Sequence, residues 1–204
     1  MAVPDRSESP LPEATPNEVG QGDRAHVRAW ALVVLGLTAM LAVAVDLVTK
    51  QLALTHLGDG HTVPLLGGAV YLDLTRNSGA AFSIGSDYTI VFPIIAVVVL
   101  VGIGWLAWRL RSLPWAVAMG LILGGALGNL VDRIFRTPSP FRGHVVDFIS
   151  VFAEDGRVFP IFNAADSALF CGVVLAIYLE FTGRRRDGTR LRPDKVKHSD
   201  RGGA

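Results

Sequence analysis

Two carboxylates stand in apolar surroundings near the last hydrophobic segment of the chain. Asp147 lies in the run Val-Val-Asp-Phe-Ile shortly before that segment, and Asp166 lies just inside it, after Phe-Asn-Ala-Ala. An ionisable side chain in or next to a bilayer is costly, so it marks a functional site by default. Two carboxyl groups that share a site can hold one proton between them, as in aspartic proteases. We therefore treat the pair as the candidate catalytic centre, which the other elements must hold at a membrane surface.

The composition is that of a membrane protein. Half of the 204 residues are hydrophobic, the mean hydropathy is +0.42, and the apolar residues fall in long blocks. The length fits one domain. The formal net charge is only +1, so no large electrostatic field attracts nucleic acid and no such partner is expected. The single cysteine, Cys171, lies in an apolar block without a paired histidine and is expected to pack in the membrane.

Four apolar blocks approach the ~20 residues that a helix needs to cross the hydrocarbon core. They cover residues 29–48, 88–108, 113–131 and 159–179. The charges inside them are Asp46 and Asp166, and the tryptophans lie near block ends, where interfacial aromatic residues belong. The sequence therefore predicts an all-α membrane protein with four transmembrane helices. The fourth has the shortest uncharged run.

Basic residues gather at three places that four spans would put on one side of the membrane. They precede the first block, fill the short turn between the second and third, and follow the fourth: Arg24 and Arg28, Arg109 and Arg111, and Arg184-Arg185-Arg186. The positive-inside rule makes this side cytoplasmic, so both termini are expected inside. Connections 49–87 and 132–157 then lie outside. Four arginines in the second of these connections weigh against this orientation: Arg133, Arg136, Arg142 and Arg157.

The segments outside the blocks are expected to form two tails and a small extracytoplasmic β element. Residues 1–25 are rich in Pro, Glu, Ser, Asn and Gly, and residues 184–204 are basic; both are predicted to be disordered cytoplasmic tails of a domain over 26–183. Residues 63–66 and 69–74 alternate loosely around a Gly-Gly pair and predict strands. The segment that follows Asn77 predicts a loop and the start of a short helix at 80–82.

Further polar residues lie at the outer ends of the predicted helices. Asp46 and Lys50 have i,i+4 spacing and share one face at the end of the first helix. Asn129, Asp132 and Arg133 share a face at the end of the third. Several costly polar groups from three helices and both outer connections thus converge at one depth. This convergence favours a site at the outer membrane–water boundary.

Each of these groups also has a structural interpretation. Asp46 and Lys50 would form an ion pair, and the adjacent Asp132 and Arg133 would pair to end the third helix. Asn163 and Asp166 have the spacing of a capping box, in which the helix dipole favours a carboxylate in the first turn. The Gly-rich stretch 124–128 favours close helix packing over a phosphate loop, since no strand precedes it.

Five motifs, in their order and their placement relative to the four blocks, resemble lipoprotein signal peptidase (signal peptidase II) of bacteria. They are Asp46-Leu-Val-Thr-Lys50, Asn77-Ser-Gly-Ala-Ala-Phe82, Gly124-Gly-Ala-Leu-Gly-Asn129-Leu-Val-Asp132-Arg133, Val145-Val-Asp147-Phe148 and Phe162-Asn163-Ala-Ala-Asp166-Ser167. The resemblance covers about residues 29–182. The stretch 135–144 is longer than the family pattern.

The resemblance implies an aspartic membrane endopeptidase that removes signal peptides from prolipoproteins. It implies hydrolysis on the N-terminal side of a diacylglyceryl-cysteine, with Asp147 and Asp166 as the catalytic pair and without metal or cofactor. It implies a supporting polar shell of Asn77, Asn129, Arg133 and Asn163, and structural or indirect roles for Asp46, Lys50, Gly125 and Asp132. The expected setting is the bacterial cell membrane, with the site near the outer leaflet. The expected partners are lipidated prolipoproteins and membrane lipids, and the protein is expected to be monomeric.

Two other functions remain open from the residues alone. A metal-dependent lipid phosphatase or transferase would use Asp46, Asp132, Asp147 and Asp166 as Mg²⁺ ligands and would lose activity with a chelator. An ion-coupled transporter would use the same acids as a relay. The clustering of the acids at one end of the spans, away from the midplane, weighs against transport.

Overall fold

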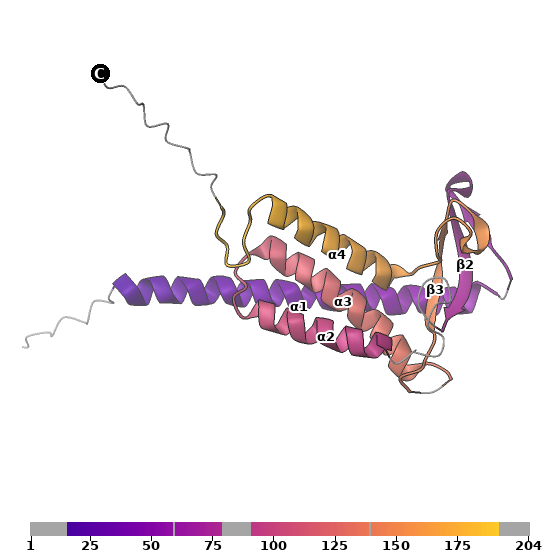
Figure 1. Cartoon of the computed structure of the whole chain (residues 1–204), viewed down its shortest axis with the longest axis horizontal. Coiled ribbons are helices and arrows are strands. Elements are labelled where there is room, and N and C mark those ends of the chain that lie inside the picture. The colour runs from indigo at the N-terminus through magenta and orange to yellow at the C-terminus, as the bar shows by residue number, and fades with distance from the viewer. Residues whose placement is uncertain (1–15, 59, 79–90, 139, 192–204) are drawn as a thin grey trace, which may run out of the picture.

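In the part of the chain that the structure describes, four α-helices run along the long axis of the molecule, and a small sheet lies at one end of the bundle (Figure 1). The computed structural model describes residues 16–58, 60–78, 91–138 and 140–191. The helices are α1 (Pro16–His56), α2 (Val91–Ala107), α3 (Leu113–Phe135) and α4 (Ala164–Phe181). The central helix is α3, which packs against the other three. The predicted helix start at 80–82 lies outside the described residues.

Three of the helices are long and apolar enough to cross a membrane. They are residues 25–56 of α1, the whole of α3 and the whole of α4. Helix α2 is equally apolar but has only 17 described residues. The fourth predicted span, whose uncharged run is the shortest, is long and apolar enough as α4. Helix α1 begins at Pro16, within the segment predicted to be disordered, so the expected boundary near residue 25 marks the start of the apolar span within a longer helix.

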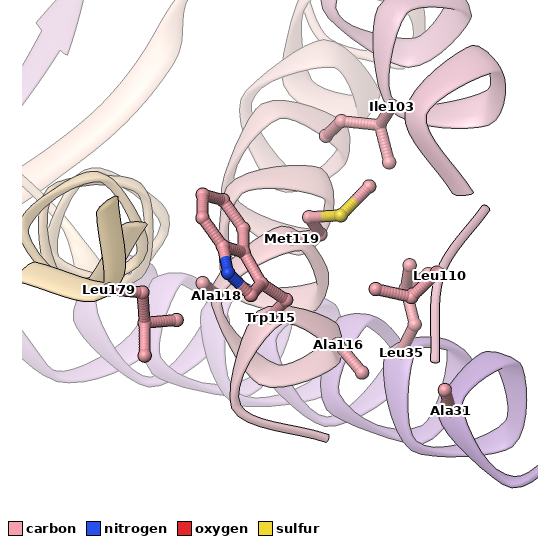
Figure 2. Packing of buried hydrophobic residues seen from close by; sticks show 9 residues of the cluster. All are labelled: Ala31, Leu35, Ile103, Leu110, Trp115, Ala116, Ala118, Met119 and Leu179. Atoms are coloured by element: carbon pink, nitrogen blue, oxygen red, sulfur yellow. The ribbon is translucent and has the colours of Figure 1, made fainter. Parts of the chain in front are cut away.

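The core of the bundle lies at the end opposite the sheet. Figure 2 shows Trp115 of α3 between its own helix and Leu179 of α4, and Ala116 turned towards Leu35 of α1. Outward faces of the helices instead expose large apolar side chains, such as Leu41, which is 66% exposed. Surface of this kind suits lipid. Because lipid tails are as apolar as the core, shape complementarity between helices must specify their packing.

The sheet has three antiparallel strands in the order β1 (Val63–Leu65), β2 (Val70–Asn77) and β3 (Val145–Val151). The first two confirm the predicted β element. The third was not predicted, because its run of apolar residues does not alternate with polar ones. Strand β3 is buried on both faces between the helices and β2, and such strands lack the period-2 pattern that identifies half-exposed ones.

The described residues after α4, up to Leu191, form turns within the segment for which a disordered tail from Arg184 was predicted. This segment turns back on itself through a bridge between Arg184 and Arg190. The carbonyl of Arg186 accepts from the backbone N–H groups of Arg111 (2.9 Å) and Ser112 (3.1 Å) in the α2–α3 turn. The indole N–H of Trp115 donates to the carbonyl of Arg184 at 2.7 Å. These donors, which lie at helix ends, need acceptors, and the tail supplies them.

Candidate active site

Strand β3 places Asp147 on the side of the sheet that faces a cavity. Side chains alternate along a strand, so Val146 and Phe148 point the other way and pack against Ala53 and Leu57 of α1. This apolar contact fixes the register of the strand against the bundle. The carboxyl group of Asp147 is thereby held 98% buried, with a relative exposure of only 2%.

Asn77 meets Asp147 across the sheet. Thr75 pairs with Asp147 and Asn77 with Val145, so Asn77 is a diagonal neighbour of Asp147 on the same face. Its Nδ2 donates to Asp147 Oδ2 at 3.0 Å. The carbonyl of Asn77 in turn accepts from Arg133 Nη1 at 3.2 Å, which connects the sheet to α3.

Asp166 occupies the first turn of α4, where Asn163 is the N-cap. Asp166 N–H donates to Asn163 Oδ1 at 2.9 Å, and Asn163 N–H donates to Asp166 Oδ2 at 3.1 Å. The capping box predicted from the spacing is confirmed. It occupies only one carboxylate oxygen, because Asp166 Oδ1 accepts from Asn129 Nδ2 at 2.7 Å. Capping therefore orients the Asp166 carboxylate through Oδ2 and leaves Oδ1 for the contact with Asn129.

Two asparagines join the carboxylates into one hydrogen-bonded chain. Asn163 Nδ2 donates to Asp147 Oδ1 at 2.7 Å and to Asn129 Oδ1 at 3.1 Å. Since Asn129 donates to Asp166, the order is Asp147, Asn163, Asn129, Asp166. The structure thus brings both predicted carboxylates and three predicted asparagines into a single cluster.

Burial changes the proton affinity of this cluster. Desolvation by burial, followed by the negative charge of Asp166, raises the pKa of Asp147 from 3.8 to about 7. Hydrogen bonds from Asn77 and Asn163 and the charge of Lys50 act in the opposite direction. A carboxyl group with such a pKa carries a proton at neutral pH for a substantial fraction of the time.

Lys50 forms a second, fully buried cluster beside the first. Its ammonium contacts Asp46 Oδ2 at 2.7 Å, Asp132 Oδ2 at 2.9 Å and Asn129 Oδ1 at 3.0 Å. The predicted Asp46–Lys50 pair is confirmed. Asp132 pairs with Lys50 and Arg136, and its charge also acts on Arg133. Helix α3 does not end at the suggested Asp132–Arg133 pair but continues to Phe135.

A cavity of about 460 Å³ opens beside the carboxylates. Its polar lining consists of Asn77, Asn129, Arg133, Asp147 and Asp166. The remaining walls are apolar and come from α2, α3, α4, Val145 of β3 and residues 159–162. Asp46, Lys50, Asp132 and Asn163 are buried behind this lining.

Glycines on α3 allow the helices to approach closely near the site. A Cβ on Gly125 would lie 2.4 Å from the carbonyl oxygen of Ala165, and one on Gly128 would lie 2.6 Å from Asp46 Oδ2. Both distances are shorter than van der Waals contact. The small-residue packing predicted for 124–128 is confirmed, and it sets how near Asn129 comes to the start of α4.

Two contributors to the site were not predicted. Arg136 pairs with Asp132 one helical turn away, and the i,i+4 spacing was a usable signal. Gly143 accepts from Arg133 Nη1 at 3.0 Å through its carbonyl, and a Cβ there would lie 2.2 Å from the carbonyl of Asp132. A backbone contact made by a loop leaves no pattern in the sequence.

The four aspartates of the Mg²⁺ hypothesis fall into two separate groups. Asp46 and Asp132 surround Lys50, whereas Asp147 and Asp166 are joined through asparagines. Across the part of the chain that the structure describes, no group of three or more His, Cys, Asp or Glu side chains is arranged to hold a metal ion.

Known proteins share these features of sequence and fold. The family described as signal peptidase (SPase) II matches residues 38–182. The lipoprotein signal peptidase of Mycobacterium avium (strain 104) is 44% identical over 189 residues, covering 92% of this chain and 100% of the relative. That of Streptomyces coelicolor is 46% identical over 158 residues, covering 78% and 75%.

A solved structure described as a bacterial membrane enzyme, at 2.3 Å resolution, aligns with a TM-score of 0.63 and 33% identity. The alignment covers 79% of this chain and 93% of that one. A second such structure, at 1.9 Å, aligns with a TM-score of 0.60 and 35% identity, covering 71% and 90%. The family match over residues 38–182 and the near-complete coverage of the Mycobacterium avium relative lead to one conclusion: the chain belongs to the signal peptidase II family of bacterial membrane proteases.

Proposed function

We propose that the protein is an aspartic endopeptidase that removes signal peptides from prolipoproteins on the N-terminal side of the diacylglyceryl-modified cysteine. Asp147 and Asp166 are the catalytic residues. The observation that carries this proposal is their arrangement: both carboxyls line one cavity and are linked through Asn129 and Asn163. Burial and the charge of Asp166 raise the pKa of Asp147 to about 7, so the pair can hold a single proton at neutral pH.

The proposed reaction is general acid–base hydrolysis by water. One carboxylate takes a proton from water as the water oxygen attacks the scissile carbonyl carbon, and the protonated partner polarises the carbonyl oxygen. The carbon–nitrogen bond then breaks, and the leaving nitrogen receives a proton from the pair. Arg133, which lines the cavity, supplies positive charge near the developing oxyanion. Asn77, Asn129 and Asn163 orient the two carboxyls.

The walls of the cavity suit a lipidated peptide. Side chains of α2, α3 and α4, such as Ile95, Leu130 and Leu169, form an apolar lining next to the carboxyls. Acyl chains of the substrate would lie along these walls while the peptide bond meets the dyad. We place the dyad near the outer leaflet of the cell membrane, with four spans and both termini in the cytoplasm. We also propose that the protein acts as a monomer.

The first test is a cleavage assay in detergent on a diacylglyceryl-cysteine precursor, with and without EDTA. Wild type should cut before the lipidated cysteine in both conditions. Asp147→Asn and Asp166→Asn should each lower kcat by at least about 100-fold, because each removes a proton-transfer group. Asp155→Asn is the matched control. Asp155 is 68% exposed and forms a surface ion pair with Arg157, so its substitution should leave kcat near the wild-type value.

Two results would contradict this proposal. Near-normal kcat in either Asp147→Asn or Asp166→Asn removes that carboxyl from the chemistry. Loss of wild-type activity in EDTA, restored by Mg²⁺, favours the metal-dependent mechanism instead.

A further inference from the structure

Lys50 is buried behind the cavity and has a full set of partners. Its ammonium lies at ion-pair distance from Asp46 Oδ2 (2.7 Å) and Asp132 Oδ2 (2.9 Å), and it donates a hydrogen bond to Asn129 Oδ1 at 3.0 Å. An ion pair kept only to neutralise charge needs one partner. Three partners, drawn from α1 and α3, define a point in space.

Each of these three acceptors holds one part of the dyad. Asp46 Oδ1 accepts from Ala165 N–H at 2.9 Å, immediately before Asp166. Asp132 Oδ2 accepts from Val146 N–H at 3.1 Å, immediately before Asp147. The third acceptor belongs to Asn129, which donates to Asp166 Oδ1.

The contact with Asn129 also fixes which way its amide points. Lys50 and Asn163 both donate to Asn129 Oδ1, at 3.0 and 3.1 Å. An amide oxygen between two donors cannot exchange places with its NH₂ group without opposing donor to donor. Asn129 must therefore present its NH₂ group to Asp166, as observed.

We propose that Lys50 is the positioning residue of the dyad: its one ammonium sets the spacing of Asp147 on β3 and Asp166 on α4 through three buried acceptors. This inference rests on the proposed function of the two carboxyls. Lys50 does not line the cavity, so it acts through its partners and has no contact with substrate. Substitution of Lys50 should therefore change kcat and have little effect on KM.

Lys50→Arg separates position from charge. Arginine keeps the positive charge, but its planar fork cannot direct three donors from one point to three acceptors. We expect kcat to fall by about 100-fold, the cost of displacing reacting groups by about 1 Å, with KM within about threefold of wild type. Arg157→Met, which removes a cation from the exposed pair with Asp155, is the control and should keep wild-type kcat.

The pH dependence of kcat distinguishes this role from a merely structural one, which would not change the pH at which kcat falls. The charged groups facing Asp147 are Asp166 from α4, Lys50 from α1 and Arg133 from α3. The charge of Lys50 lowers the pKa of Asp147. Lys50→Met should therefore move the alkaline limb of kcat to higher pH, whereas Lys50→Arg should leave the limb in place and lower its height.

The outcomes separate this inference from the proposed function. Wild-type cleavage that is lost in the Asp147→Asn and Asp166→Asn variants, together with near-normal kcat in Lys50→Arg, overturns the role of Lys50 alone. Failure of wild type to cut overturns the proposed function instead. If Lys50→Arg does not fold, as judged by thermal unfolding in detergent, Asp46→Asn and Asp132→Asn each weaken one arm of the cluster. Both should then lower kcat at constant KM, and wild-type kcat in both overturns the inference.

Discussion

Asn77 donates to Asp147 Oδ2 at 3.0 Å, and this contact favours the ionised carboxylate. Burial disfavours the ionised form and has the larger effect, so the pKa of Asp147 lies at about 7. The balance decides which protonation state the dyad has at neutral pH. Single side chains around the dyad, none of which touches the scissile bond in our mechanism, thus control the working pH range.

The pH dependence of kcat should follow Asp147. Its pKa is raised, so the carboxyl is protonated below about pH 7 and loses its proton as the pH rises through that value. If the reaction needs one proton on the pair, kcat should fall above about pH 7. Asn77→Ala removes a hydrogen bond that lowers this pKa, and its alkaline limb should move to higher pH. A limb that is unmoved, or that moves to lower pH, would contradict this account of Asp147; Asp155→Asn should reproduce the wild-type profile.

Charge balance gives an independent reason for one shared proton. Four carboxylates and three cations lie in contact with one another or with the asparagine chain: Asp46, Asp132, Asp147 and Asp166, with Lys50, Arg133 and Arg136. An uncompensated buried charge costs several kcal/mol. The charges of these seven side chains cancel when the dyad carries one proton. Its surroundings therefore favour the state that acid–base hydrolysis requires.

Among single residues, the sequence predicted most of the polar side chains in the cluster but not all of their partners. Asp46, Lys50 and Asn163 were recognisable because i,i+4 and i,i+3 spacings are local. The contact of Lys50 with Asn129 joins residues 79 positions apart, and no local pattern predicts it. The dual role of Asp166, as cap and as cavity lining, also needed the structure, because spacing alone left the two as alternatives.

Among the elements, the α3–α4 contact decides where Asp166 lies relative to Asn129. Helix α4 crosses α3 at Gly125, where the backbone of α4 takes the space of a side chain. The sheet contributes in another way: β3 inserts between β2 and α1 and carries Asp147 to the cavity. The sequence predicted the glycine contact from its small residues. It did not predict β3, because a strand buried on both faces reads as an apolar run.

Gly125→Ala should damage both stability and activity. Its Cβ would lie 2.4 Å from Ala165 O and 2.9 Å from Leu169 N, both backbone atoms that cannot move alone. We expect α4 to shift away from α3, at a cost of about 1–3 kcal/mol, and kcat to fall as Asp166 separates from Asn129. Thermal unfolding in detergent and the cleavage assay measure the two effects.

Gly104→Ala is the matched control for this prediction. Gly104 is also helical, but a Cβ there meets nothing within 4 Å, so the change should be neutral or slightly stabilising, as expected for alanine in a helix. Equal losses in both variants would mean that helix glycines matter for flexibility in general, and the close-contact explanation would fail.

Over the whole molecule, the polar cluster and the basic turns lie at opposite ends. Arg28 stacks over Trp108 with its guanidinium carbon 5.4 Å from the ring centroid, and Arg186 lies 5.9 Å from the ring of Trp115. The part of α1 around Arg28, the α2–α3 turn and the segment after α4 therefore meet at one end of the bundle. The three basic groups used to predict orientation converge there, as they must if all face one side of the membrane.

The proposed orientation can be measured with single cysteines in a Cys171→Ser background. His61, beside β1, and Asp187, after α4, are both exposed and lie at opposite ends of the bundle. In intact spheroplasts, a membrane-impermeant maleimide should label the His61→Cys variant, whereas the Asp187→Cys variant should react only after lysis. Both should react equally in detergent, which controls for intrinsic reactivity. Because the dyad lies at the sheet end, the reverse pattern would put it on the cytoplasmic side, where a peptidase acting on exported precursors would not meet its substrate.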